Sequence, residues 1–390
     1  MISYGRQDIT PADIDAVVAV LRSDFLTQGP AVPRFERSVA ARVGAKHAVA
    51  VNSATSALHI ACLALEVAPG DLLWTVPNTF VASANCARYC GAQVDFVDID
   101  PVTWNMSVAA LRIKLAHARR SGRLPKVVVP VHFSGQPPEQ EAISELAREY
   151  GFKIIEDASH AIGASRNGEP VGSCRWSDIT VFSFHPVKVI TSGEGGMALT
   201  NDDVLAQRMA LYRSHGITRD ASRFRDAARD DVPEWYYEQQ VLGFNYRMTD
   251  IHAALGDSQL QRLDAYVERR NQLAQRLDRA FSDLPLRLPA VQPANRSAFH
   301  LYVVRLSPAA ASSRRQIYDE LRRRGIGVNL HYLPVHLQPY YRDLGFASGR
   351  FPESESYARE AFTVPLFAAM SERVQDEVID AVRATVGRYA

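Results

Sequence analysis

The sequence predicts an α/β fold in which a mostly parallel sheet is sandwiched between layers of helices. From residue 48 onward, short apolar runs alternate with segments whose apolar residues recur at helical spacing. The runs are mostly apolar and read as continuous strands. Continuous apolar strands separated by helices are typical of a parallel sheet that is buried on both faces.

The expected elements follow one another in a simple order. Strands are expected at Ala48–Val51, Leu72–Pro77, Val94–Ile99, Val127–Phe133 and Ile154–Ile155. Helices are expected between them at Ser56–Leu65, Ala82–Tyr89, Val108–Arg119 and Glu139–Tyr150. An earlier helix should begin after Thr10, because a hydroxyl cap is followed there by Pro11 and, three residues after the cap, by Asp13.

The second part of the chain has a different pattern. A chain of 390 residues is too long for one small core, so we expect two domains, 1–255 and 256–390. The second domain is predicted to be smaller and α+β, with a strand at His300–Leu306, a helix at Arg314–Arg324 and a strand at Gly327–Tyr332. A charged helix, Tyr266–Phe281, should link the two domains. Residues Thr218–Glu238 lack periodicity and should form a mobile or inserted loop.

Composition excludes several classes of function. The net charge is +1, which favours neither a nucleic-acid nor a membrane partner. Arg6 and Asp8 precede any apolar run, so no signal peptide is expected and a cytoplasmic location is predicted. The four cysteines have no zinc spacing and are interpreted as buried free thiols, so no metal site is expected.

One lysine stands out chemically. The run Phe182-Ser183-Phe184-His185-Pro186-Val187-Lys188 leaves a predicted strand, and Gly193-Glu194-Gly195-Gly196 follows, so Lys188 should lie on an irregular loop. An amine in apolar surroundings loses hydration, so its pKa should fall from about 10.4 and the free amine becomes a nucleophile. A surface lysine whose stem covers apolar residues is the alternative.

Polar residues follow several of the predicted strands, where ligands of α/β sheets bind. Ala54, Thr55 and Ser56 open a helix and, with Ser183, form a candidate anion site, although an ordinary helix cap is the commoner use of such residues. Phe80 offers an aromatic face. Asp157 and His160 leave a buried strand together, which requires partners for both.

Together these groups match the needs of pyridoxal phosphate. That cofactor requires an amine, a phosphate anchor, a platform for its ring and an acid opposite its pyridine nitrogen. Lys188, the Ala54–Ser56 turn, Phe80 and Asp157 provide one candidate for each.

The same motifs resemble a known family over nearly the whole chain. The chain is similar to the sugar-nucleotide aminotransferases of the DegT/DnrJ/EryC1/StrS type, fold type I pyridoxal phosphate enzymes. The resemblance is carried by 52–58, 156–161, 183–188 with 193–196, and 245–248. Tyr4, Phe25–Gly29, Ala54, His160 and His331–Pro334 resemble the subgroup that aminates a UDP-4-keto-6-deoxy-N-acetylhexosamine in pseudaminic acid biosynthesis.

The resemblance implies a role for each motif residue. Lys188 would hold the cofactor and move a proton, with L-glutamate as the amino donor. Asp157 would pair with the ring nitrogen, His160 would contact the ring hydroxyl, and Phe80 would cover the ring. The phosphate would be held by Ala54, Thr55 and Ser183, joined by Asn245 from the other subunit of a homodimer with shared active sites. The sugar nucleotide would be lined by Tyr4, Phe25, Leu26, Thr27, His331, Tyr332 and Leu333.

Three alternatives stay open. The substrate could be another 4-keto or 3-keto nucleotide sugar. The chain could instead be a pyridoxal-dependent sugar dehydratase, although such relatives carry histidine in place of the lysine. It could also be a non-catalytic binding protein, against which the presence of both Lys188 and Asp157 argues.

Overall fold

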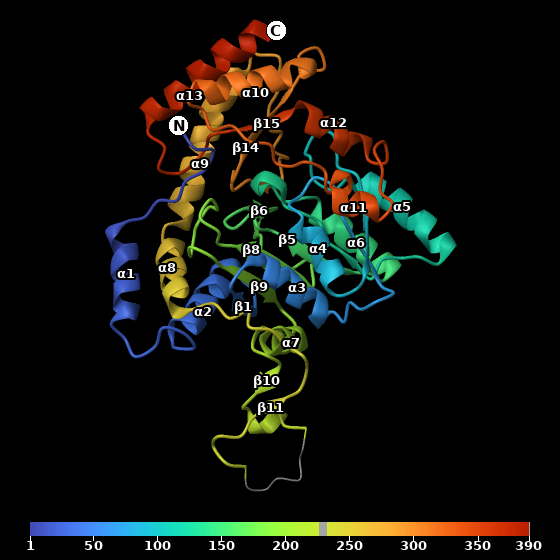
Figure 1. Ribbon diagram of the computed structural model, residues 1–390, viewed down its shortest axis with the longest axis vertical. Helices are drawn as coiled ribbons and strands as arrows, with labels where there is room; N and C mark the ends of the chain where they lie inside the picture. Colours follow the sequence, from blue (N-terminus) through green and yellow to red (C-terminus); the bar gives the residue numbers. More distant parts are fainter. Residues whose placement is uncertain (226–231, 390) are drawn as a thin grey trace.

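A seven-stranded sheet forms the centre of the computed structural model, which describes residues 1–225 and 232–389 (Figure 1). Its strands lie in the order β1-β9-β8-β5-β4-β2-β3. Strand β9 runs antiparallel to both of its neighbours, and the other pairs are parallel. In chain order the strands are β1 His47–Val51, β2 Leu72–Thr75, β3 Gln93–Phe96, β4 Val127–Val128, β5 Lys153–Asp157, β8 Ile179–Ser183 and β9 Gly196–Thr200.

Helices cover both faces of this sheet, as the apolar strands predict. Helices α3, α4 and α7 pack against one face, where Leu58, Ala87 and Met209 share a core with strand residues. The other face is covered by α2 and α8 at one end and by α5 and α6 at the other. The helices of this part are α1 Pro11–Leu21, α2 Ala31–Val43, α3 Ala54–Ala64, α4 Ala82–Tyr89, α5 Val108–Ser121, α6 Gln140–Tyr150, α7 Asp203–Arg213 and α8 Asp250–Leu260.

The C-terminal part is α+β, as predicted. An antiparallel sheet of β12 Leu286–Arg287, β14 Tyr302–Leu306 and β15 Ala361–Val364 shares a core with helices α9, α10 and α13. The helices here are α9 Leu263–Phe281, α10 Arg314–Arg323, α11 Pro339–Asp343, α12 Pro352–Glu360 and α13 Glu372–Val386. The expected boundary after residue 255 falls inside α8, and the early part of α9 packs with the large core. The division 1–255 and 256–390 therefore stays a prediction.

Short strands complete the described structure. Strands β6 Ser165–Arg166, β7 Glu169–Pro170 and β13 Asn295–Arg296 form one small sheet. Strands β10 Ile217–Thr218 and β11 Glu238–Gln239 pair at the two ends of the expected inserted loop, which projects at the bottom of Figure 1. Residues 226–231 of that loop lie outside the described residues.

Several predicted strands differ from the structure. β2 ends at Thr75 instead of Pro77, β3 ends at Phe96 instead of Ile99, and β14 begins at Tyr302 instead of His300. The strand expected at Val127–Phe133 is shorter, because β4 ends at Val128 and the chain then turns through Ser134, whose φ is +62°. The strand expected at Gly327–Tyr332 is wrong. Within this range only Asn329 forms a bridge, to Thr363, because the chain then bends away to line a cavity.

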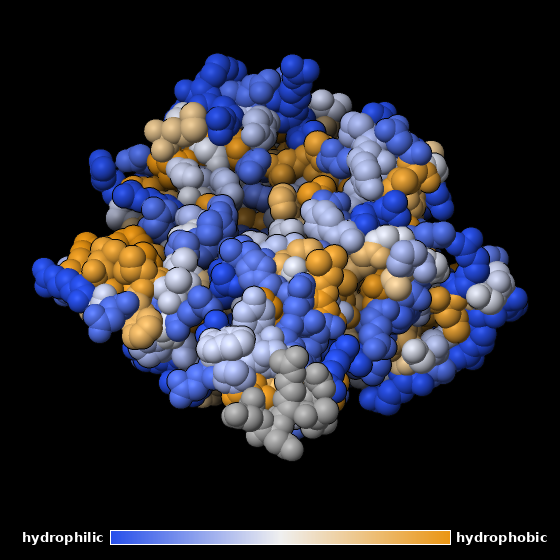
Figure 2. All heavy atoms as spheres, turned by 60° about the horizontal axis from the view of Figure 1, so that its bottom comes forward, coloured by the Kyte–Doolittle hydropathy of each residue, from blue (hydrophilic) through white to orange (hydrophobic). Residues whose placement is uncertain are grey.

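Apolar side chains gather on the outer surface around α1. Ile14, Leu21, Phe25 and Leu26 are each about half exposed. In Figure 2 hydrophobic atoms cover the left edge of the molecule, where α1 lies in Figure 1. Separately, no helix within residues 1–225 and 232–389 combines the length and the apolar character needed to cross a membrane.

Candidate active site

A cavity of about 410 Å³ lies at the carboxyl ends of β2, β5 and β8, where α/β sheets bind their ligands. The N-terminus of α3 closes one side, and the segment 329–332 closes another. The lining residues are Tyr4, Ser53, Ala54, Thr55, Leu58, Thr79, Phe80, Ala82, Val131, Asp157, Ser159, His160, Ser183, His185, Lys188, Glu194, Asn329, Leu330, His331 and Tyr332.

Lys188 lies on the loop between β8 and β9, as predicted. A turn forms where its backbone N–H donates to the carbonyl of His185 at 2.9 Å, and Ser192 N–H donates to the Phe184 carbonyl at 2.9 Å. The side chain is half-buried. Burial lowers the pKa of Lys188 from its ordinary value to about 8, against the opposing effect of the Asp157 carboxylate. A much larger fraction of free amine therefore exists near neutral pH than for an ordinary lysine.

The start of α3 forms a cradle for an anion. Ser53 caps the helix by accepting the N–H of Ser56 at 3.2 Å, and the first N–H groups of a helix have no acceptor within the helix. Strand β9 approaches this turn very closely, since a Cβ on Gly196 would lie 2.4 Å from the nitrogen of Ala54. Only glycine fits there. Gly196 of β9 pairs with Ser183 of β8, and this pairing brings the Ser183 hydroxyl to the cavity.

Asp157 ends β5 and is held by the backbone and by side chains. Its N–H donates to the Pro130 carbonyl at 3.0 Å, and its carbonyl accepts the N–H of His132 at 3.0 Å. The carboxylate Oδ1 accepts the N–H of Ser159 at 3.1 Å, while Oδ2 accepts the hydroxyl of Ser83 at 2.6 Å. The side chain is 5% exposed and lines the cavity. It can therefore present a fixed negative charge to a ligand.

The tautomer of His160 follows from its contacts. The N–H of Ser134 donates to His160 Nδ1 at 3.2 Å, so Nδ1 is the acceptor of the neutral ring and the proton lies on Nε2. Nε2 faces the hydroxyl of Tyr332 at 3.2 Å. Burial lowers the pKa of His160 well below its ordinary value, and the charges of Lys188 and His331 lower it further. His160 is thus a neutral hydrogen-bond donor at the cavity wall.

Aromatic rings line another side of the cavity. Phe80 is 57% exposed, and its ring centroid lies 6.2 Å from that of Tyr332. The rings of Tyr4 and His331 are 4.9 Å apart. Burial, with Lys188 as a smaller cause, lowers the pKa of His331 to about 3, and its Nδ1 lies 2.8 Å from the Thr363 hydroxyl. This side offers flat, uncharged surfaces.

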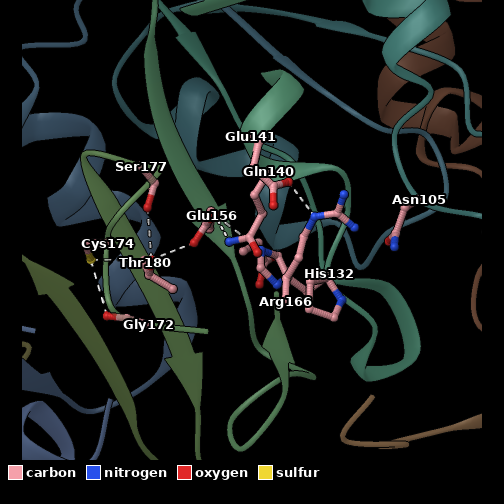
Figure 3. A network of polar contacts seen from close by, with 12 residues as sticks. Asn105, His132, Gln140, Glu141, Glu156, Arg166, Gly172, Cys174, Ser177 and Thr180 are labelled. Carbon is pink, nitrogen blue, oxygen red and sulfur yellow. Dashed lines mark hydrogen bonds and ion pairs between the residues drawn. The ribbon is translucent and has the colours of Figure 1, made fainter. Parts of the chain in front are cut away.

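A buried polar network supports β5 from its other face (Figure 3). Glu156 precedes Asp157, so its side chain points away from the cavity. Its Oε2 accepts the hydroxyl of Thr180 at 2.8 Å, and Oε1 accepts the amide of Gln140, with His132 Nε2 3.7 Å away. Burial alone raises the pKa of Glu156, but His132, Gln140 and Thr180 outweigh it and lower that pKa below its usual value. An ionised carboxylate therefore anchors the strand that carries Asp157.

The cavity fits pyridoxal phosphate by the chemistry of its donors. It combines an amine, a helix N-terminus beside a glycine that permits close backbone approach, a carboxylate, a neutral imidazole donor and an exposed ring. Ten of the residues predicted from the sequence lie together here: Tyr4, Ala54, Thr55, Phe80, Asp157, His160, Ser183, Lys188, His331 and Tyr332.

Five predicted residues do not line the cavity of this chain. Asn245 is exposed and forms a bridge with Ser214, and Leu333 is 58% exposed. Phe25, Leu26 and Thr27 lie on the loop before α2. That loop is adjacent to the start of α8, because Thr27 bridges to Thr249 and Asp250 N–H donates to the Leu26 carbonyl at 3.0 Å. The roles predicted for these five residues stay predictions.

Several lining residues were not predicted as site residues. Thr79 and Ser53 lie directly beside residues that the sequence singled out, so their positions at strand ends were an available signal. His185 and Glu194 flank the lysine loop. Asn329 and Leu330 carried no such signal, because the segment that contains them was read as a strand.

Comparison with known proteins decides the family. The model of the DegT/DnrJ/EryC1/StrS aminotransferase family matches residues 7–383. The chain belongs to this family. It is a pyridoxal-phosphate-dependent aminotransferase of fold type I.

Relatives extend over the full chain. The spore coat polysaccharide biosynthesis protein SpsC of Bacillus subtilis is 38% identical over 390 residues, 99% of this chain and 97% of SpsC. A UDP-4-amino-4,6-dideoxy-N-acetyl-beta-L-altrosamine transaminase of Campylobacter jejuni is 35% identical over 372 residues, 95% of this chain and 94% of the relative. The solved structure of Helicobacter pylori PseC, an aminotransferase of pseudoaminic acid biosynthesis, superposes with a TM-score of 0.89 at 28% identity, covering 99% of each chain.

Proposed function

We propose that this family member is a sugar-nucleotide aminotransferase that moves the amino group of L-glutamate to C4 of a UDP-4-keto-6-deoxy-N-acetylhexosamine, in pseudaminic acid biosynthesis. The observation that carries the proposal is the position of Lys188, a half-buried amine with a lowered pKa that shares its cavity with Asp157 and His160. The similarity to the C. jejuni transaminase and to PseC supports this choice of substrate.

Different residues of this chain would have different roles in the reaction. Bound pyridoxal phosphate supplies an electron sink for the carbon that gains or loses its proton. Lys188 Nζ would hold the cofactor and then carry that proton, for which a pKa of about 8 is suited. Asp157 would face the ring nitrogen and stabilise its positive charge. His160 would donate through Nε2 to the ring hydroxyl in place of Tyr332, and the start of α3 would hold the phosphate.

A shared site in a homodimer forms part of the proposal. Lys188 is the one lysine or arginine among the lining residues of the described chain, whereas glutamate and a UDP-sugar bring several negative charges. Asn245 and Arg247 lie outside this cavity, on the segment next to α8. The loop of Phe25, Leu26 and Thr27 adjoins the start of α8. We place the surface formed by Asn245, Arg247 and the loop of Phe25, Leu26 and Thr27 against the partner's cavity. The exposed apolar residues on and after α1 support an interface at this surface.

The proposed compartment is the cytoplasm. All four cysteines are buried free thiols, as the sequence predicted. Free thiols are usual in a reducing compartment.

One assay tests the substrate directly. The purified enzyme is incubated with L-glutamate and, separately, with UDP-, GDP- and dTDP-linked 4-keto sugars, and amination is read by mass spectrometry. The proposal predicts amination of the UDP-linked 4-keto-6-deoxy-N-acetylhexosamine ahead of the others. Amination of only GDP- or dTDP-linked sugars would reject the substrate while leaving the aminotransferase chemistry intact.

A second candidate substrate is another 4-keto or 3-keto nucleotide sugar. The similarity to SpsC, which is named for spore coat polysaccharide biosynthesis, favours it. The same panel of sugars, extended to 3-keto nucleotide sugars, separates the two candidates.

A further inference from the structure

The Asp157 carboxylate is contacted from outside the cavity by a hydroxyl that the roles above leave unused. Ser83 lies in the first turn of α4 and is fully buried, at 0% exposed. Its Oγ is 2.6 Å from Asp157 Oδ2, a short distance typical of a hydrogen bond to an ionised oxygen. Within the described chain, Ser83 is absent from the cavity lining, so it acts on a ligand only through Asp157.

A second hydroxyl, that of the cavity-lining residue Thr79, contacts Ser83. Thr79 Oγ1 lies 2.7 Å from Ser83 Oγ, and Thr79 is 2% exposed. An ionised carboxylate accepts hydrogen bonds only, so the single proton of the Ser83 hydroxyl points to Asp157. The Phe80 carbonyl, 3.3 Å from Ser83 Oγ, is the poorer acceptor. The Thr79 hydroxyl must then donate to Ser83, and the chain runs Thr79 to Ser83 to Asp157.

We propose that Ser83 is the positioning residue of Asp157, and that the Thr79–Ser83 hydroxyl chain fixes this carboxylate, in its ionised form, opposite the ring nitrogen of pyridoxal phosphate. The inference rests on the proposed role of Asp157. The two oxygens have separate anchors: Ser159 N–H holds Oδ1 at 3.1 Å, and Ser83 holds Oδ2. Consecutive hydrogen bonds polarise one another, so Thr79 strengthens the bond that Ser83 makes.

The test measures pyridoxal phosphate affinity and the pH midpoint of the bound cofactor's visible absorption band. In Ser83→Ala the carboxylate loses a charge-assisted hydrogen bond, and we expect roughly tenfold weaker cofactor binding. Positive charge on the ring nitrogen makes the rest of the conjugated cofactor more acidic, so a loosened Asp157 shifts the midpoint to higher pH. Thr79→Val should shift both quantities in the same direction by less. Ser83→Thr, which keeps the hydroxyl, should restore both.

Thr75 provides a matched control. It is fully buried at the end of β2, and its hydroxyl donates to the Val129 carbonyl at 2.8 Å, without contact to Asp157. Thr75→Val therefore removes one buried hydrogen bond, as Ser83→Ala does, and should lower the melting temperature while leaving cofactor affinity and midpoint at wild-type values. If Ser83→Ala does not fold, Thr79→Val and Ser83→Thr still carry the comparison.

Distinct results separate this inference from the proposed function. Wild-type affinity and midpoint in Ser83→Ala, with both quantities impaired in Asp157→Asn, would overturn the role of Ser83 alone. Unchanged cofactor properties in Asp157→Asn would overturn both that role and the position of Asp157 opposite the ring. Equal effects in Ser83→Ala and Thr75→Val would reduce Ser83 to a structural residue and overturn the inference.

Discussion

Replacing Lys188 by methionine should stabilise the cofactor-free protein, and the gain should shrink as the pH rises. The lysine is held in a site where its ammonium is poorly hydrated, and its pKa is lowered from 10.5 to about 8. Between these two values the unfolded chain carries a proton that the folded protein has lost. Because the unfolded state binds more protons there, the free energy of unfolding rises with pH across that window.

The size of the effect follows from the shift. One pKa unit corresponds to about 1.4 kcal/mol, so Lys188 lowers the free energy of unfolding by roughly 3 kcal/mol at pH 7. At about pH 9.5 more than half of the range between the two pKa values has been crossed. The amount by which Lys188 lowers the free energy of unfolding then falls to roughly 1.5 kcal/mol. Solvent at the cavity mouth reduces both figures, since the side chain is half-buried. Lys188→Met should remove this pH-dependent cost.

Urea unfolding of both cofactor-free proteins at several pH values between 7 and 9.5 measures the difference. Lys153→Met is the control, because the hydrogen bond to Asp178 raises the pKa of Lys153. That contribution is constant over this pH range, so the control should change stability without a pH trend. A Lys188→Met difference that is independent of pH, or that grows with pH, would contradict a desolvated amine at this position.

Three further predictions concern the site. Asp157→Asn should lower turnover by about 10²- to 10³-fold in steady-state assays, because an amide lacks the charge that the ring nitrogen needs; a helix cap alone would survive the change. His160→Gln should keep most of the cofactor affinity, since its amide can accept from one side and donate from the other, whereas His160→Phe should bind roughly tenfold more weakly by absorbance titration. Equal affinities of the two variants would refute the hydrogen-bonding role assigned to His160. Asn245→Asp and Lys188→Ala, each nearly inactive, should regain turnover when mixed under subunit exchange, because a mixed dimer contains one intact site; confirmed exchange without activity would reject the shared site.

The sequence predicted the layered sheet well because buried parallel strands leave a strong apolar signal. The helix expected at Ala82–Tyr89 has those bounds, and the sheet strands lie where the apolar runs are. The reversal of β9 left no such signal, since an antiparallel strand buried on both faces is equally apolar. At Gly327–Tyr332 the expected strand did not form, because residues 329–332 line the active-site cavity and only Asn329 forms a bridge, with Thr363.

The site residues could be predicted where a reactive or aromatic side chain directly follows a predicted strand. Lys188, Asp157 and Phe80 follow strands directly, and topology brings strand ends together. Ser83 was missed because a serine within a helix is common, and only the fold brings it within 2.6 Å of Asp157. Asn245 shows the opposite limit: its motif was recognisable, but Asn245 is exposed outside the cavity of this chain, and its role in a partner's site stays a prediction.

The central claim is that the cavity around Lys188 holds pyridoxal phosphate on this lysine. Reducing the loaded enzyme with borohydride, digesting it and mapping the peptides by mass spectrometry tests that claim directly. We predict that the reduced cofactor is found on the peptide containing Lys188, and that Lys188→Ala carries no covalent cofactor after the same treatment. Attachment to another lysine, or an unmodified Lys188 in an enzyme that retains its yellow colour before reduction, would contradict it.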